Sequence, residues 1–182
     1  AALDLGIQSS NGEIILSTDA DCVVPSTWIE GMVNSFSSDD VGIVTGFSLL
    51  KDFNRNSLLE KNSIIDRLSS IFHSIFIKLQ SLELLSLFSA FVGSFGLGIA
   101  LGSTGNNIAY RREVYDELGG FVNLGFTVAE DNMFVQWVDK NTNWRILPVC
   151  NSEVNVKTYP MDIFVDFIRQ RIRWASNSLE NR

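Results

Sequence analysis

Two aspartates separated by one residue could bind a ligand at the end of a strand. Asp19 and Asp21 follow the apolar run 14–16, which begins after an Asn-Gly turn signal. A short apolar run between turn residues is typical of a buried, parallel strand, and open α/β sheets bind ligands at the carboxyl ends of such strands. Alternation along an extended chain points both carboxylates to one side. They would suit Mg²⁺ or Mn²⁺, or they would simply cap the following turn.

A second acidic pair, Glu130-Asp131, opens a helix expected over residues 132–140. Acidic residues are stabilised at the positive end of a helix dipole, which is a sufficient structural reason for the pair. The same field keeps a carboxylate ionised, as a general base must be if it also faces a pocket. The local sequence is compatible with both interpretations.

The last expected helix, at about residues 162–177, combines three polar or aromatic groups. At 100° per residue, Gln170, Arg173 and Trp174 share one side and the apolar residues share the other. Arginine binds a diphosphate with two parallel hydrogen bonds, and an aromatic plane stacks on a sugar ring or a base. The alternative is a solvated basic helix with one partly buried Trp. An exposed Trp between Gln and Arg favours a functional role.

Composition limits the classes of partner. The 182 residues are 46% hydrophobic and carry a net charge of -7. That acidity argues against nucleic acid, which requires a basic surface, and it suits a protein that recruits a divalent cation before an anionic substrate. Cys22 and Cys150 lack the spacing of a zinc motif or a disulfide framework.

The elements that must hold these side chains follow an α/β pattern. A helix should end near residue 10, and a strand ending in the first aspartates leads to a helix at 27–36. A second buried strand at 41–46 then completes a strand–helix–strand unit. Further strands are expected just before Arg111 and at 144–149, with a short helix at 113–118 that Gly119-Gly120 ends.

The middle of the chain has a different pattern. Ser57 and Glu60 form a capping box, and apolar residues then recur at positions 58, 65, 72 and 79, with 68, 75 and 82 offset by three. This stripe predicts an amphipathic helix that faces the core, a partner helix or a membrane surface. Residues 84–101 carry no charge. Their length and apolarity alone would make them a candidate for a membrane span. Their glycines and serines favour a buried or membrane-surface segment instead.

The order of these motifs resembles glycosyltransferase family 2. The set comprises Asp-x-Asp, a Gly-x-Asn segment running into Arg-Arg, Gly-Gly-Phe, Glu-Asp and Gln-x-x-Arg-Trp. It is most similar to the membrane-associated branch with cellulose and hyaluronan synthases, from residue 2 to Trp174. The resemblance implies a Rossmann-like nucleotide-sugar glycosyltransferase A fold, N-terminally truncated, with amphipathic helices inserted or appended. Residues 1–182 would be a partial catalytic domain, with a βαβ part at 1–50, a helical insertion at 55–104 and an acceptor half at 105–182.

The resemblance also implies roles for individual residues. Asp19 and Asp21 would hold the nucleotide diphosphate through Mg²⁺ or Mn²⁺. Asp131 would be the general base, with Glu130 beside it. The remaining predicted residues would bind the diphosphate or the acceptor, namely Gly105, Asn106, Gln170, Arg173 and Trp174.

The implied reaction is inverting transfer of a hexose from a nucleotide-diphosphate sugar, expected to be a UDP-sugar, to a carbohydrate or lipid acceptor. Polysaccharide or glycolipid synthesis at the cytoplasmic face of the cell membrane would follow, with the full-length protein associated with the membrane. Family members begin with a further nucleotide-binding βαβ portion and carry transmembrane helices, so this piece alone is expected to be inactive.

Two rival hypotheses explain part of the sequence. The strand-end Asp-x-Asp also resembles that of haloacid-dehalogenase-like phosphatases, in which Asp19 would be the phosphoryl nucleophile. That hypothesis leaves Gln170, Arg173 and Trp174 unexplained and lacks a convincing Lys before Glu130. A non-catalytic membrane-surface or interaction module would use only the amphipathic stripe and the uncharged stretch.

Overall fold

The molecule is built on a mixed four-stranded sheet. A computed structural model describes residues 2–51, 64–123 and 130–179. The strand order is β1 (Ile14–Ser17), β4 (Ile108–Arg111), β2 (Val41–Gly46) and β5 (Arg145–Val149). Strand β4 is antiparallel to both neighbours, and β2 is parallel to β5. The carboxyl ends of β1, β2 and β5 therefore meet the start of β4 at one edge.

The predicted strand–helix–strand unit exists, but its two strands are not neighbours. Strand β4 lies between β1 and β2, and Ile108 is in register with both Ser17 and Thr45. The expectation of a buried, parallel β1 was wrong, because β1 is only half-buried and pairs antiparallel with β4 alone among the described strands. The connecting helix α2 (Trp28–Asn34) buries Trp28 and Met32 and leaves Ile29 exposed.

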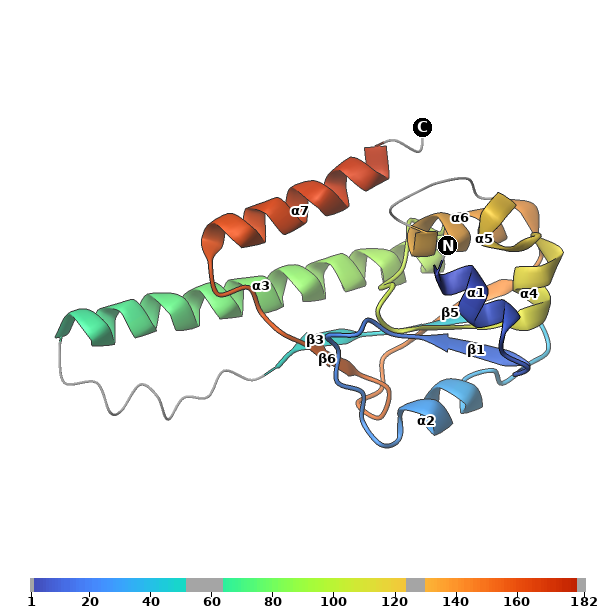
Figure 1. Cartoon of the computed structure of the whole chain (residues 1–182), viewed down its shortest axis with the longest axis horizontal. Coiled ribbons are helices and arrows are strands. Elements are labelled where there is room, and N and C mark those ends of the chain that lie inside the picture. Colours follow the sequence, from blue (N-terminus) through green and yellow to red (C-terminus); the bar gives the residue numbers. More distant parts are fainter. Residues whose placement is uncertain (1, 52–63, 124–129, 180–182) are drawn as a thin grey trace.

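Helices cover both faces of this sheet (Figure 1). On one face lie α1 (Ala2–Gln8), α4 (Arg112–Glu117), α5 (Gly120–Asn123) and α6 (Glu130–Asn141), and on the other lies α2. Each face has its own core, and neighbouring residues of β4 divide between them. Ile108 and Tyr110 join the core under α6, whereas Ala109 joins the core under α2. The result is the α/β layering that the sequence predicts.

The middle of the chain forms one long helix where the sequence predicted two segments. Helix α3 (Ile64–Gly96) runs for 33 residues without interruption, and the proposed Ser57–Glu60 capping box lies outside the described residues. Leu97 and its successors then leave the helix and lead to residue 104 in irregular structure. The predicted boundary between an amphipathic helix and an uncharged stretch therefore has no counterpart in the backbone.

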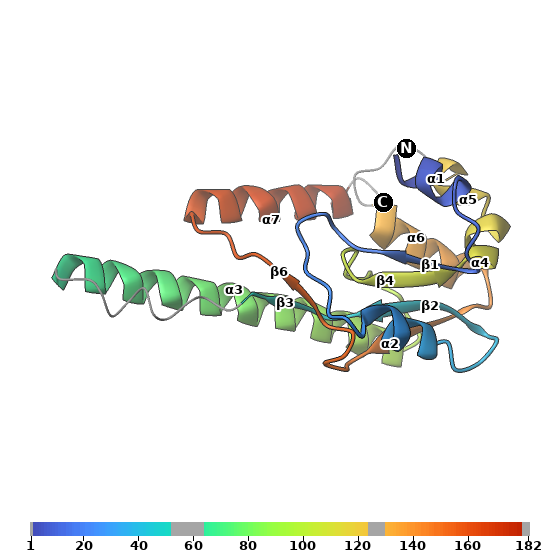
Figure 2. The same ribbon diagram turned by 60° about the horizontal axis from the view of Figure 1, so that its bottom comes forward.

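Helix α3 extends beyond the sheet, and α7 (Phe164–Leu179) lies beside its projecting part (Figures 1 and 2). A two-stranded parallel sheet of β3 (Ser48–Leu50) and β6 (Val156–Thr158) joins this arm to the rest of the molecule. The apolar stripe of α3 does not face the core: Ile65 is 76% exposed and Phe72 is 69% exposed. We call this surface the apolar face of α3, consisting of Ile64, Ile65, Leu68, Ile71, Phe72, Ile75, Leu79 and Leu82.

Candidate active site

The first acidic pair lies in a tight turn beyond the carboxyl end of β1. The Cys22 N–H donates to the Asp19 carbonyl at 3.0 Å and closes this turn. Both aspartates are exposed, and Cys22 is half-buried. One ligand atom from each of Asp19, Asp21 and Cys22 lies within 4.8 Å of the other two. The turn thus places two carboxylate oxygens and a thiol together at the sheet edge where ligands of α/β folds bind.

The second acidic group reaches the same edge from α6. Asp131 is half-buried in the first turn of that helix, and its carboxylate accepts a hydrogen bond from the Gly105 backbone. A Cβ atom on Gly105 would lie 1.9 Å from Asp131 Oδ2. Only glycine allows this approach, so the predicted pairing of Gly105 with the site has a steric basis. Glu130 begins α6, and its side chain lies outside the described part of the structure.

The residue after Gly105 contacts the turn that carries the first acidic pair. Asn106 Nδ2 lies 3.6 Å from Cys22 Sγ, and the Ser48 hydroxyl donates to Asn106 Oδ1 at 2.5 Å. The short segment 105–106 therefore connects Asp131 on one side with the Asp19–Cys22 turn on the other. This segment immediately precedes the central strand β4, so the sheet itself fixes its position.

A buried asparagine that sequence reasoning missed anchors this segment. Asn107 is fully buried, and its Oδ1 accepts from Trp28 Nε1 at 2.9 Å. Its Nδ2 donates to the Phe47 and Val154 carbonyls at 2.9 and 2.8 Å. These bonds satisfy a buried amide and tie three chain segments together. An Asn-Asn pair before a strand normally indicates an exposed turn, so no sequence signal identified this role.

The pKa shifts show that the charge of Asp19 interacts with those of Asp131 and Arg173. Burial raises the pKa of Asp131, and the charge on Asp19 raises it further, against the lowering effect of backbone donors. Although Asp19 is exposed, loss of part of its hydration raises its pKa, as does Asp21, whereas Arg173 lowers it. Asp131 and Arg173 therefore both lie within electrostatic reach of Asp19.

Helix α7 supplies the remaining predicted residues. Gln170 is half-buried, Arg173 is exposed, and Trp174 is 39% exposed. Between them Arg171, which the sequence did not single out, lies with its guanidinium carbon 4.2 Å from the centre of the Trp174 ring. The structure thus brings the charge of Arg173 within reach of Asp19. It also holds Trp174 beside Arg171 on the same helix.

The sequence of this chain also matches a described family. The family model of glycosyl transferase family 21 matches residues 2–181. The chain belongs to this family. Membership supports the predicted glycosyltransferase activity, whereas the branch of family 2 with cellulose and hyaluronan synthases is not confirmed. No curated protein sequence matches this family 21 chain.

The fold of the family 21 chain is similar to that of a solved glycosyltransferase. It is similar to mannosyltransferase PcManGT from Pyrobaculum calidifontis, which was solved in complex with GDP-Man and Mn²⁺. The TM-score is 0.62 at 18% identity, over 97% of this chain and 40% of that one. The likeness confirms the predicted Rossmann-like glycosyltransferase fold. The chain spans less than half the length of this structural relative.

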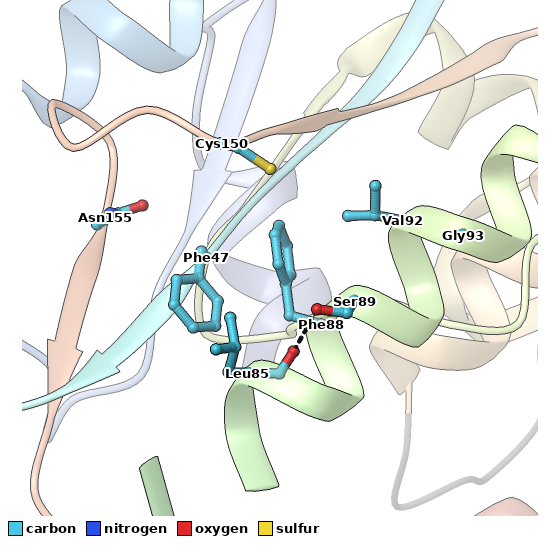
Figure 3. Close-up of a pocket in the computed structure, with 8 residues that line it drawn as sticks. All are labelled: Phe47, Leu85, Phe88, Ser89, Val92, Gly93, Cys150 and Asn155. Carbon is cyan, nitrogen blue, oxygen red and sulfur yellow. Dashed lines mark hydrogen bonds between the residues drawn. The ribbon is translucent and has the colours of Figure 1, made fainter. Parts of the chain in front are cut away.

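A separate pocket of about 480 Å³ lies between α3 and the ends of β2 and β5 in the family 21 chain (Figure 3). Its walls include Phe47 and Phe88, whose ring centroids are 4.8 Å apart, and Cys150. The described lining carries no charged side chain. This lining therefore offers no charged group for acid–base or diphosphate chemistry.

Proposed function

We propose that this chain transfers a sugar, with inversion, from a nucleotide-diphosphate sugar to an acceptor hydroxyl. The observation that carries the proposal is that the segment 105–106 contacts Asp131 on one side and Cys22 of the Asp19–Cys22 turn on the other. A sugar transferase needs a cationic environment for the leaving diphosphate and a carboxylate for the acceptor. Both kinds of group surround the edge at which β1 ends.

The acidic turn is suited to a divalent metal. Asp19 and Asp21 offer hard oxygen donors within 4.8 Å of each other, which are the ligands that Mg²⁺ and Mn²⁺ prefer. When bound, the metal would neutralise charge on the departing diphosphate. Arg173 would bind the same diphosphate, because its charge already reaches Asp19. The Mn²⁺ and GDP-Man of the structural relative support a metal and a nucleotide-sugar donor.

Asp131 would take the proton of the acceptor hydroxyl. Burial raises its pKa, and a more basic carboxylate accepts a proton more readily. The hydroxyl oxygen would then attack the anomeric carbon as the bond to the diphosphate breaks. A single displacement of this kind inverts the configuration, so an α-linked donor gives a β-glycosidic product. Trp174 would stack on the acceptor sugar, and Gly105 and Asn106 would line its pocket.

The apolar face of α3 would lie on a membrane surface. Helix α3 is the one helix among the described residues that is long and apolar enough to cross a membrane. However, Glu83 and Gln80 of the same helix bind α7 and the segment before it. A helix that binds α7 through polar side chains and also exposes many apolar residues suits the interface better than a full span. This placement would bring the site to acceptors of polysaccharide or glycolipid synthesis at the cytoplasmic face.

The direct test is a screen of UDP- and GDP-sugars with the intact protein in lipid nanodiscs, with Mn²⁺ or Mg²⁺, by release of nucleoside diphosphate. Asp21→Asn and Asp131→Asn should each lower the rate by about 10²-fold or more. Asp116→Asn, an exposed aspartate on α4, is the matched control and should retain activity. Full activity in Asp131→Asn, or Asp19-dependent release of phosphate from simple monoesters instead, would contradict the proposal.

A further inference from the structure

Polar and aromatic contacts attach helix α7, and the segment that precedes it, to α3. Gln80 of α3 is almost fully buried, and its amide makes two hydrogen bonds to the Met161 backbone, of 2.8 and 2.9 Å. The Phe76 ring of α3 packs against Phe164 and Phe167, with centroids 5.8 and 5.5 Å apart. These contacts hold the first turn of α7 beside the projecting part of α3.

An ion pair fixes the next turn of α7. Both Nε and Nη2 of Arg171 donate to the two carboxylate oxygens of Glu83. The Arg171 side chain is 18% exposed and that of Glu83 is 33% exposed. A two-point bond of this kind fixes the guanidinium plane, which a lysine cannot reproduce. The orientation of Arg171 is therefore set by α3.

The same guanidinium contacts two of the predicted site residues. Its Nη1 donates to Gln170 Oε1 at 2.5 Å. Its central carbon lies 4.3 Å from the centre of the Phe167 ring and 4.2 Å from that of Trp174. The Arg171 guanidinium thus lies over both aromatic rings and also donates to the amide oxygen of Gln170.

We infer that Arg171 and Glu83 form a positioning pair that sets the orientation of Trp174 and Gln170 for the acceptor. The inference rests on the proposed function, in which these two residues bind substrate. Glu83 occupies the donors of Arg171 that would otherwise grip a diphosphate, whereas Arg173 remains within reach of Asp19. The two arginines therefore have different roles. Arg173 binds the donor, and Arg171 orients Trp174 and Gln170 for the acceptor.

The test compares Arg171→Lys and Glu83→Gln with Arg169→Lys in the intact protein. Arg169 is the matched control, because it lies on the same helix and pairs with Asp166 at 3.1 Å while 75% exposed. Arg171→Lys and Glu83→Gln should raise the acceptor KM about tenfold and leave the donor KM unchanged. Amide hydrogen exchange across residues 164–175 should rise in both, and not in Arg169→Lys.

A double-mutant cycle separates positioning from general support of the helix. If Arg171 acts through Trp174, Arg171→Lys should cost little more in kcat/KM for the acceptor when Trp174→Phe is already present. Additive losses, or equal losses for donor and acceptor, would overturn the inference and leave the proposed function intact. Faster exchange with unchanged acceptor KM would do the same. Absence of any sugar transfer by the wild type would overturn the proposed function and this inference together.

Discussion

The backbone of Gly105 lies directly against the carboxylate of Asp131, at a distance that no other residue type allows. The Gly105 backbone also hydrogen-bonds that carboxylate, and a Cβ atom would lie 1.9 Å from Asp131 Oδ2. Two segments that are separated in the chain therefore share one steric constraint. The position of the proposed base depends on the absence of a side chain from residue 105.

Gly105→Ala should consequently displace Asp131 and lower transfer about tenfold to 10²-fold, because small misplacement of a catalytic group is costly. Gly6→Ala is the matched control. Gly6 lies within α1, and nothing lies within 4 Å of an added Cβ. Its stability should be unchanged or higher by up to about 1 kcal/mol, since Ala favours helices. Steady-state rates and thermal unfolding of the two variants provide the comparison, and wild-type rates in Gly105→Ala would refute the steric argument.

The rate of transfer should fall in mild acid. Since the pKa of Asp131 is raised above its ordinary value, protonation removes the base at a higher pH than for a solvated aspartate. The folded state binds this proton more tightly than the unfolded state does. The stability from this group is therefore greatest below the unfolded pKa and is lost as pH rises through the folded pKa.

Asp131→Asn should therefore be inactive yet no less stable than wild type at pH 7. Rate profiles and melting curves from pH 4 to 8 would check both signs. An acidic limb at the position of an ordinary aspartate, or a marked loss of stability at pH 7 in Asp131→Asn, would show that burial does not control this carboxyl.

Alkaline pH should destabilise the core around α4. The Tyr115 hydroxyl donates to Asp4 Oδ1 at 2.6 Å, and burial together with this bond raises the pKa of Tyr115 to about 12. The folded state keeps the phenol proton in a range in which the unfolded state loses it. Stability should therefore decline between about pH 10 and pH 12. Urea titrations at several pH values would measure this decline, and Tyr115→Phe should remove the part due to this group.

Cys22 offers a chemical probe of the acidic turn. Partial burial and the nearby Asp19 and Asp21 charges raise the pKa of the Cys22 thiol, so alkylation at pH 7 should be slow. Mn²⁺ with UDP or GDP should slow it further by covering the turn. Cys150 is exposed and serves as the internal control. Mass spectrometry of the labelled peptides would give both rates, and equal protection of the two cysteines would argue against a metal-diphosphate site at the turn.

Local patterns in the sequence identified most elements of this fold. The Gly119-Gly120 signal ends α4 as predicted, with φ of +74° at Gly119. The order of strands could not be read in this way, because β4 enters between β1 and β2 from sixty residues away in the chain. Apolar runs report burial, and they do not specify which strand is the neighbour.

The site shows the same division. Asp19, Asp21 and Asp131 could be proposed from the order of the motifs along the chain, although each acidic pair also has a local structural explanation. Asn107 and Glu83 could not be proposed, since their importance comes from partners 79 and 88 residues away. Long-range hydrogen bonds leave no periodic signal along the chain. The apolar face of α3 was visible as a stripe, but only the packing decided that it is exposed.

The stereochemistry of the product provides the most direct test of the central claim that Asp131 acts as the base in a single displacement. NMR of the anomeric proton should be recorded on the product formed by the intact protein from an α-linked nucleotide sugar. We expect a β-linked product, formed by Asp131→Asn at a rate lower by about 10²-fold or more. An α-linked product, or β-linked product formed at wild-type rate by Asp131→Asn, would contradict this claim.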